Sequence, residues 1–236
     1  MNTGIQTHPA PLPRAFYARH PAIVASEVIG KQLVRQLDNG ELTAGRIVEA
    51  EAYLSSRDSA CHATRGMTRK NATMFGPAGH AYVYMIHARW CLNAVTEDIG
   101  QGSAVLIRAI EPLAGIELMQ QRRGVEKHLD LARGPARLCQ ALDVTRRFDG
   151  WDLTVGRELW IAECSREELV AASGLSRIAR SRRIGVTSAH HRLLRFFLAG
   201  SPYVSGPRRS HSARSIARAA TEVKSLRRYR AADRSS

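Results

Sequence analysis

The 236-residue sequence predicts a single domain of mixed strand and helix structure. Its length suits one domain with a large buried core. The content of 44% hydrophobic and 24% charged residues is ordinary for a globular protein. Segments with the two-residue alternation of strands are interspersed with segments of helical periodicity, and no internal repeat divides the chain. We therefore expect one domain over residues 14–206.

The predicted elements begin after a polar, proline-rich leader at residues 1–13, which we expect to be disordered. Residues 16–34 carry helical periodicity, with Gly30 near the end. Strands are predicted over residues 45–54, 80–87, 103–110, 158–163, 183–187 and 193–199, and helices over 112–123, 134–142 and 165–173. Two long loops remain, at 55–79 and 89–102. Loops of this size in a compact domain are more often functional than idle.

The charge of the chain is strongly positive, with 35 Lys and Arg residues against 21 acids and a net charge of +14. Such a field indicates an anionic partner, first a nucleic acid and second an acidic membrane surface. Arginine outnumbers lysine, which suits bidentate phosphate contacts but can also reflect genome composition. The tail at residues 207–236 is basic and predicted to be disordered, either as a solvated segment or as an additional nucleic-acid-binding arm.

Several classes of protein are disfavoured. The four cysteines lack the paired spacing of a zinc ribbon or a disulfide framework. The N-terminus lacks the pattern of a signal peptide, and no apolar stretch reaches membrane-spanning length. We therefore expect a cytoplasmic protein, associated with the nucleoid if it is bacterial. The common phosphate-loop, dinucleotide, serine-hydrolase and zinc-protease motifs are missing from the sequence.

Two acids mark the first predicted strand. Glu49 and Glu51 are two residues apart, so their side chains face the same side of a sheet. A carboxylate next to Tyr53 and a loop bearing His62 could serve as a general base beside an aromatic surface. The alternative is that both acids form ion pairs with strand neighbours such as Arg46 or Arg108.

The second predicted strand adds aromatic side chains to this picture. Tyr82 and Tyr84 share a face by the two-residue period, and His87 follows at the end of the strand. Alternating aromatics are usually core residues or cross-strand pairs. Combined with an acid and a basic surface, they are also consistent with a pocket in which a nucleic-acid base stacks.

Five motifs carry a resemblance to a known family. They are VEAEAYLSSRDSACHATRG, KNATMFGPAGHAYVYMIHARWCLNAVT, VLIRAIEPLAG, ARGPARLCQAL and LRFFLAGSPYVS, in this order. Together they resemble the alkyladenine (3-methyladenine) DNA glycosylases, the monofunctional enzymes of base-excision repair. The resemblance implies an α+β fold, a single domain with a curved, mainly antiparallel sheet surrounded by helices. It also implies a monomer that acts on double-stranded DNA containing damaged purines and uses no cofactor and no metal.

The resemblance also implies roles for individual residues. Glu51 would be the general base that activates water, Arg108 would help to hold that water, and Glu49 would be a structural neighbour. Asn93 would crowd position 2 of the purine and disfavour normal guanine. Tyr53, His62 and Tyr84 would enclose the flipped base. The damaged purine could be 3-methyladenine, 7-methylguanine, hypoxanthine or ethenoadenine.

The DNA contacts include one departure from the family pattern. The family inserts a tyrosine followed by glycine into the minor groove, whereas this sequence has His87 and Ala88, followed by Arg89. We expect His87 to act as the wedge, with tighter binding below neutral pH because imidazole can take up a proton. The remaining expected DNA contacts are Lys70, Gly134 and Arg137, the glycine through free N–H groups at a helix start unless that is a plain helix terminus.

Two competing interpretations remain. The chain could be a non-catalytic binder of distorted or damaged DNA, which would not need Glu51. It could also be a hydrolase of RNA or of a small molecule on the same fold, since a fold does not fix a function. Lyase chemistry is not expected, because Lys70 is the only lysine within a motif and a phosphate contact suits its loop better than a Schiff base.

Overall fold

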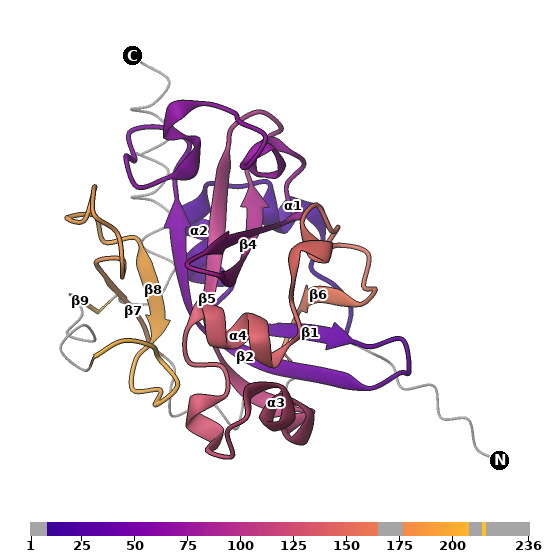
Figure 1. Cartoon of the computed structure of the whole chain (residues 1–236). Coiled ribbons are helices and arrows are strands. Elements are labelled where there is room, and N and C mark those ends of the chain that lie inside the picture. The colour runs from indigo at the N-terminus through magenta and orange to yellow at the C-terminus, as the bar shows by residue number, and fades with distance from the viewer. Residues whose placement is uncertain (1–8, 165–176, 208–213, 216–236) are drawn as a thin grey trace.

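The computed structural model describes residues 9–164, 177–207 and 214–215. They form a curved antiparallel sheet with helices packed against it (Figure 1). The strand order is β3-β4-β5-β2-β8-β7-β9, and β1 pairs with both β2 and β6. The strands are β1 Gln32–Gln36, β2 Leu42–Tyr53, β3 Ala81–Ile86, β4 Arg89–Thr96, β5 Ser103–Ala114, β6 Leu159–Ala162, β7 Ile178–Ser181, β8 Arg195–Leu198 and β9 Arg214–Ser215.

Short helices connect and cover these strands. The α-helices are α1 Arg14–Tyr17, α2 Pro21–Glu27, α3 Ile116–Arg123 and α4 Pro135–Ala141, and the 3-10 helices are η1 His62–Arg65, η2 Ala72–Phe75, η3 His128–Asp130 and η4 Arg146–Phe148. The predicted single α+β domain with a curved antiparallel sheet is confirmed. Residues 1–8 of the predicted leader, the predicted helix at 165–173 and most of the tail lie outside the described residues. The rest of the leader is not disordered as expected, because Leu12 is buried and its N–H donates to the carbonyl oxygen of Ile161 at 2.8 Å.

Four predicted elements differ from the structure. The helix predicted over 112–123 begins only at Ile116, because β5 continues to Ala114. The helix predicted over 16–34 is two short helices followed by β1, because Gly30 has a φ of 91° and ends the helical path. The loop predicted over 89–102 is largely β4. Residues 183–187 are not a strand, and β7 lies earlier, at Ile178–Ser181.

Strand β2 bends the sheet. Its first half pairs with β1 and its second half pairs with β8, while β5 accompanies it along most of its length. The β2–β5 register shifts on either side of Glu49, so Val48 and Arg108 have no direct partner across the ladder. Bulges of this kind bend a strand and redirect side chains, and they are common next to active sites. Gly115, between β5 and α3, has a φ of 66° and leaves no room for a Cβ atom, which would lie 2.4 Å from the carbonyl oxygen of Leu42.

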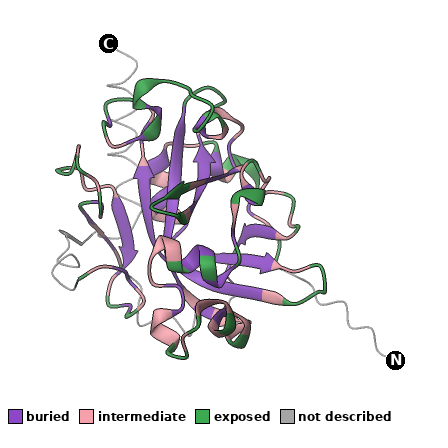
Figure 2. Ribbon diagram, viewed as in Figure 1, coloured by how far each residue is buried: buried purple, intermediate pink, exposed green. Residues whose placement is uncertain are grey.

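The main hydrophobic core lies between the sheet and the helices. Residues 43–52 of β2 are all buried, and Figure 2 shows the central strands buried while the outer loops are exposed. Alternate residues of the strands enter this core, among them Ala50 and Ala52 of β2, Leu92 and Ala94 of β4, and Val105 and Ile107 of β5. The residues between them therefore face the opposite side of the sheet, where polar and aromatic side chains gather.

The β3–β4 hairpin has an unusual tip. Its two-residue turn consists of His87 (φ 47°) and Ala88 (φ 58°), both in the left-handed region. Hairpin turns of this type favour Asn-Gly because residues with a Cβ atom are strained there. Two large apolar side chains next to the turn are exposed, Met85 to 51% and Ile86 to 47%. The hairpin thus presents an apolar, solvent-exposed end.

We expect Ala88→Gly to stabilise the protein by about 0.5–1 kcal/mol, because glycine adopts the left-handed conformation without the Cβ clash. The free energy of unfolding in urea measures this effect. Ala136→Gly, inside helix α4, is the matched control and should destabilise by a similar amount. A loss of stability in Ala88→Gly would contradict the described turn.

Candidate active site

The two acids of the opening strand lie where the two-residue alternation places them. Glu49 and Glu51 are both fully buried, at 0% exposure. The intervening Ala50 and the following Ala52 enter the main core, so both carboxylates face the other side of the sheet. Burial of two carboxylates requires strong partners, because a buried charge without a partner is costly.

Glu49 is held by two arginines. Its Oε1 accepts hydrogen bonds from Nε of Arg195 at 2.6 Å and Nε of Arg108 at 2.9 Å, and its Oε2 accepts one from the backbone N–H of Ser205 at 2.7 Å. Burial by itself would raise the pKa of Glu49, but the attraction of Arg108 and Arg195 and these hydrogen bonds outweigh it and lower the pKa. Glu49 is a charged structural anchor.

Glu51 is held by longer hydrogen bonds than Glu49 and by one arginine instead of two. The backbone N–H of Ile184 donates to its Oε1 at 2.8 Å, and the hydroxyl of Tyr53 at 3.0 Å and Nη1 of Arg108 at 3.3 Å donate to its Oε2. An ionised carboxylate offers about four acceptor positions. Three donors among the described residues reach Glu51, one fewer than this number of acceptor positions.

Ion pairing is thus present on this strand. Arg108 bridges Glu49 and Glu51, as the structural alternative expected. The other expected partner, Arg46, lies 3.5 Å from Glu111 instead. The carboxylates raise the pKa of Arg108 and outweigh the opposing effect of its burial, so this arginine stays charged beside them.

Aromatic side chains gather on the same side of the sheet. The rings of Tyr82 and Tyr84 stack with centroids 5.3 Å apart, and His62 contacts Tyr84 edge-on at 4.6 Å. The Tyr82 hydroxyl lies 3.0 Å from Nδ1 of His62. Tyr53 packs against this cluster. Burial raises the pKa values of the three tyrosines and lowers that of His62, which favours neutral rings.

Asn93 connects the acids with the aromatic cluster. The sheet register pairs Tyr82 with Asn93, Asn93 with Leu106, and Leu106 with Glu51, so these residues form one row across four strands. Directly opposed residues share a face. The Asn93 side chain is buried and its Nδ2 donates to the carbonyl oxygen of Tyr82 at 2.9 Å. The orientation of this amide is therefore fixed.

Arg183 is a site residue that the sequence did not predict. Its guanidinium group forms two hydrogen bonds with Asp58, at 2.6 and 2.7 Å, and lies over the Tyr53 ring, 4.6 Å from the centroid. The next residue, Ile184, supplies the N–H that binds Glu51. The segment 183–187, expected as a strand, instead holds Tyr53 and Glu51 in place.

Two of the predicted DNA contacts lie together. Arg89, which follows the His87–Ala88 turn, and Arg137, on α4, line one surface groove of about 640 Å³. His87 is exposed at the tip of the hairpin. Lys70 lies elsewhere, exposed in the turn before η2.

Gly134 lies at the start of helix α4, where phosphate contact through free N–H groups was predicted. It is the N-cap residue of α4, but its own N–H donates to the carbonyl oxygen of Ala132 at 3.1 Å. The next residue, Pro135, has no N–H. Gly134 therefore has no free N–H of its own, and the phosphate contact expected through the other N–H groups of this helix start stays a prediction. The side chain of Arg137 lies at the same helix start.

Residues 9–164, 177–207 and 214–215 contain no group of three or more metal-ligating side chains. Within the same ranges, no helix combines the length and apolar character needed to cross a bilayer.

Comparison with known proteins places the chain in a family. Residues 15–202 match the methylpurine-DNA glycosylase family. A relative from Mesorhizobium japonicum is 46% identical over 204 residues, 86% of this chain and 93% of the relative. Relatives from Methanoculleus marisnigri, 46% identical, and Carboxydothermus hydrogenoformans, 45% identical, each cover 82% of this chain and 98% of their own length. All three carry the provisional name 3-methyladenine DNA glycosylase. The chain is therefore a member of the methylpurine-DNA glycosylase family.

Proposed function

We propose that this protein is a DNA glycosylase that hydrolyses the N-glycosidic bond of damaged purines in duplex DNA, with Glu51 as the general base. The row of Glu51, Asn93 and the tyrosine cluster on one face of the sheet is the observation that carries this proposal. A carboxylate that activates water lies next to a surface on which a purine can stack. The family and the names of the relatives support DNA as the substrate.

The proposed reaction begins with rotation of the damaged nucleotide out of the duplex. The base then stacks among Tyr53, His62 and Tyr84, and each stacking contact contributes roughly 1–3 kcal/mol. This places the sugar near Glu51, in a site where two arginine-carboxylate clusters hold the surrounding side chains. The neutral rings suit a purine, because they stack without adding charge to the pocket.

The bond-breaking step uses water. The water oxygen bonds to C1′ of the sugar while the bond from C1′ to the base nitrogen breaks, and Glu51 takes the proton of the water. The negative carboxylate also offsets the positive charge that develops on the sugar. A methylated purine that carries a positive charge leaves as a neutral base, so Glu51 suffices for that class. Arg108, held by both acids, would help to keep the water in place.

Release of bases from defined substrates tests this function. The substrates are methylated DNA and duplexes containing hypoxanthine or ethenoadenine, with the undamaged duplex as control. We expect base release from at least one damaged substrate and strand breaks only after alkali treatment, because a hydrolytic glycosylase leaves an intact abasic strand. Strand cleavage without alkali, together with trapping of the enzyme on DNA by borohydride, would contradict hydrolysis by water.

The second role we propose concerns the hairpin tip, where His87 would fill the space left by the flipped nucleotide. Met85 and Ile86, exposed beside it, would add apolar contact with the bases. We expect His87→Ala to weaken binding to lesion-containing DNA roughly tenfold, since filling the gap offsets an unstacking cost of a few kcal/mol. Equal affinity of the two proteins for lesion-containing DNA would show that His87 is not the wedge.

A non-catalytic binder of damaged DNA remains the second candidate. The exposed apolar hairpin favours it, because a wedge alone can recognise a distorted duplex. The two functions differ in their need for Glu51, and the corresponding variant is treated in the Discussion.

A further inference from the structure

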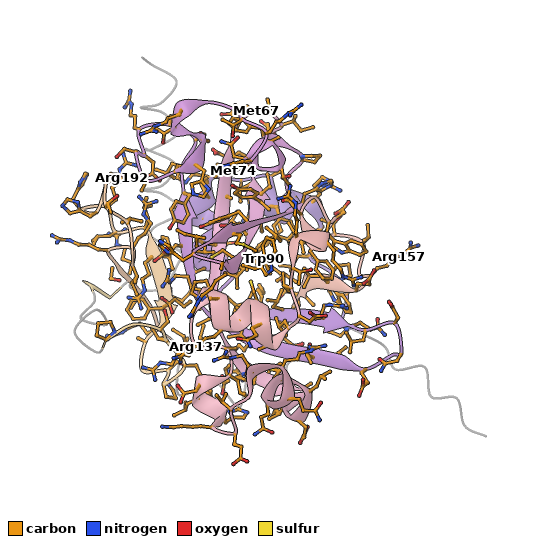
Figure 3. The ribbon with its side chains drawn as sticks, viewed as in Figure 1. Met67, Met74, Trp90, Arg137, Arg157 and Arg192 are labelled. Carbon is orange, nitrogen blue, oxygen red and sulfur yellow. The ribbon has the colours of Figure 1, made fainter. Side chains whose placement is uncertain are left out.

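A groove of about 640 Å³ lies beside the β3–β4 hairpin, and no residue of the aromatic cluster lines it. Its walls come from three elements: the turn and start of β4, the C-terminal end of α3, and α4 with the residues that follow it. Figure 3 labels Trp90 and Arg137, which lie on the same side of the molecule and both line the groove. None of the catalytic or base-stacking roles proposed above uses it.

The groove is lined by four arginines, Arg89, Arg122, Arg123 and Arg137, and by one carboxylate, Asp143. This concentration of positive charge favours an anion. Burial lowers the pKa values of Arg122 and Arg123, and the neighbouring charge of Arg137 lowers that of Arg123 further. An anion bound among these guanidinium groups would relieve their repulsion.

The two inner arginines are held in position by the protein itself. Nη1 of Arg122 donates to the carbonyl oxygen of Ala141 at 3.0 Å, and Nε of Arg123 donates to that of Leu131 at 3.0 Å. A site whose charged groups are fixed before the ligand arrives loses less entropy on binding. Arg137 pairs with Asp130 at 3.1 Å on the surface, an arrangement that contributes little to stability.

The position of the groove indicates which anion it meets. Ala88, at the hairpin tip, lines it together with Arg89 and Trp90, so the groove begins at the proposed wedge. The minor groove of B-DNA is only about 6 Å wide. A hairpin that enters it therefore has a sugar-phosphate backbone close on each side. The backbone on the α4 side would lie against the four arginines.

We propose that this groove binds phosphodiester groups of one DNA strand next to the flipped nucleotide, and that Arg122 and Arg123 contribute to it together with Arg89 and Arg137. This inference rests on the proposed function, since it assumes that the hairpin enters a duplex. Backbone contacts fix the position and orientation of a protein on DNA without reading its sequence. The groove would thus set the angle at which the wedge and the pocket approach the damaged base.

The salt dependence of DNA binding tests the proposal. Arg89→Gln and Arg137→Gln remove exposed guanidinium groups. Arg157→Gln is the matched control, because Arg157 is exposed at the right edge of the view in Figure 3 and does not line the groove. We expect each groove variant to lower the slope of log affinity against log salt concentration by about 1 and to weaken binding roughly tenfold. The control should bind as the parent does. Slopes in both groove variants equal to that of the parent would overturn the proposal.

Methylphosphonate linkages locate the contact. Each replaces one charged phosphate by a neutral group, on either strand beside a hypoxanthine. We expect the parent to lose affinity at one or two positions on a single strand. Arg137→Gln should lose none there, because its contact with the phosphate is already missing. Equal losses in both proteins at every position would contradict a groove contact. Inorganic phosphate is tested separately: saturable binding to the parent, with no loss at any methylphosphonate, would assign the groove to a free anion instead.

Base release by the unsubstituted protein distinguishes a failure of this proposal from a failure of the proposed function. If the parent releases damaged bases while the groove variants keep its salt slope and its methylphosphonate profile, only the groove proposal fails. If the parent releases no base from any damaged substrate, the glycosylase proposal fails, and the same binding measurements still decide whether the groove holds DNA.

Discussion

Glu51→Gln is expected to lower the rate of base release by about 100-fold or more, because a positioned general base contributes roughly 10²–10⁴-fold to the rate. Glutamine has the same shape, and its carbonyl oxygen can still accept the hydrogen bond from Ile184. It carries no negative charge and does not take a proton from water. The measurement is the excision rate with enzyme in excess over a lesion-containing duplex, alongside the affinity for the same duplex.

The affinity decides between the two candidate functions. We expect Glu51→Gln to bind the lesion duplex about as well as the parent, since Glu51 is buried and the stacking surface is unchanged. Glu27→Gln is the control and should excise at the parent rate. Glu27 lies on α2 and pairs with Arg19. If neither the parent nor Glu51→Gln releases any base although both bind, the protein is a binder.

Arg195→Met is expected to destabilise the protein by about 3–5 kcal/mol, the usual cost of removing one partner from a buried ion pair. Arg195 is fully buried and donates to Glu49 at 2.6 Å, to Oγ of Ser181 at 2.9 Å and to the carbonyl oxygen of Ser205 at 3.0 Å. Without it, Glu49 keeps one of its two arginines. The free energy of unfolding in urea at neutral pH measures the loss.

A second substitution, Glu49→Gln, and the pH dependence of the free energy of unfolding separate the effect of charge from the effect of packing. Glu49→Gln in the Arg195→Met background should recover part of the loss, because no unpaired charge then remains. The lowered pKa of Glu49 means that its contribution is present above the ordinary value of 4.5 and is lost as the pH falls through its folded-state value. Arg195→Met should therefore show a shallower acid decline. The charge network would be contradicted if the losses of stability from the two substitutions were additive and the decline of stability in acid were unchanged.

The residues of the site fall into two groups. Some are related by the spacing within a single strand, and others are brought together only by the fold. The pair Glu49 and Glu51, and the pair Tyr82 and Tyr84, follow from the two-residue period within single strands, a local property that is visible in the sequence. Tyr82 was placed on the aromatic face in this way, although its hydrogen-bond distance to His62 was not predicted. In contrast, Ile184, Arg195 and Ser205 reach the acids from more than 130 residues away. No spacing in the sequence indicates such contacts.

The errors in the predicted fold have physical causes. The β3–β4 hairpin was missed because its turn, His87–Ala88, lacks the Asn-Gly or Asp-Gly signal that usually marks a two-residue hairpin. Residues after it were consequently assigned to a loop. The 183–187 segment has the composition of a strand, but its Arg183 side chain and Ile184 N–H serve Asp58 and Glu51 instead of a strand ladder. Tertiary contacts override local propensity there.

The most direct test of the central claim follows a single ethenoadenine in duplex DNA by fluorescence, which changes when the base leaves the stack, together with the amount of free base released. The account predicts that the parent shows unstacking followed by release, and that Glu51→Gln shows the same unstacking with almost no release. Release by Glu51→Gln at the parent rate would contradict Glu51 as the general base.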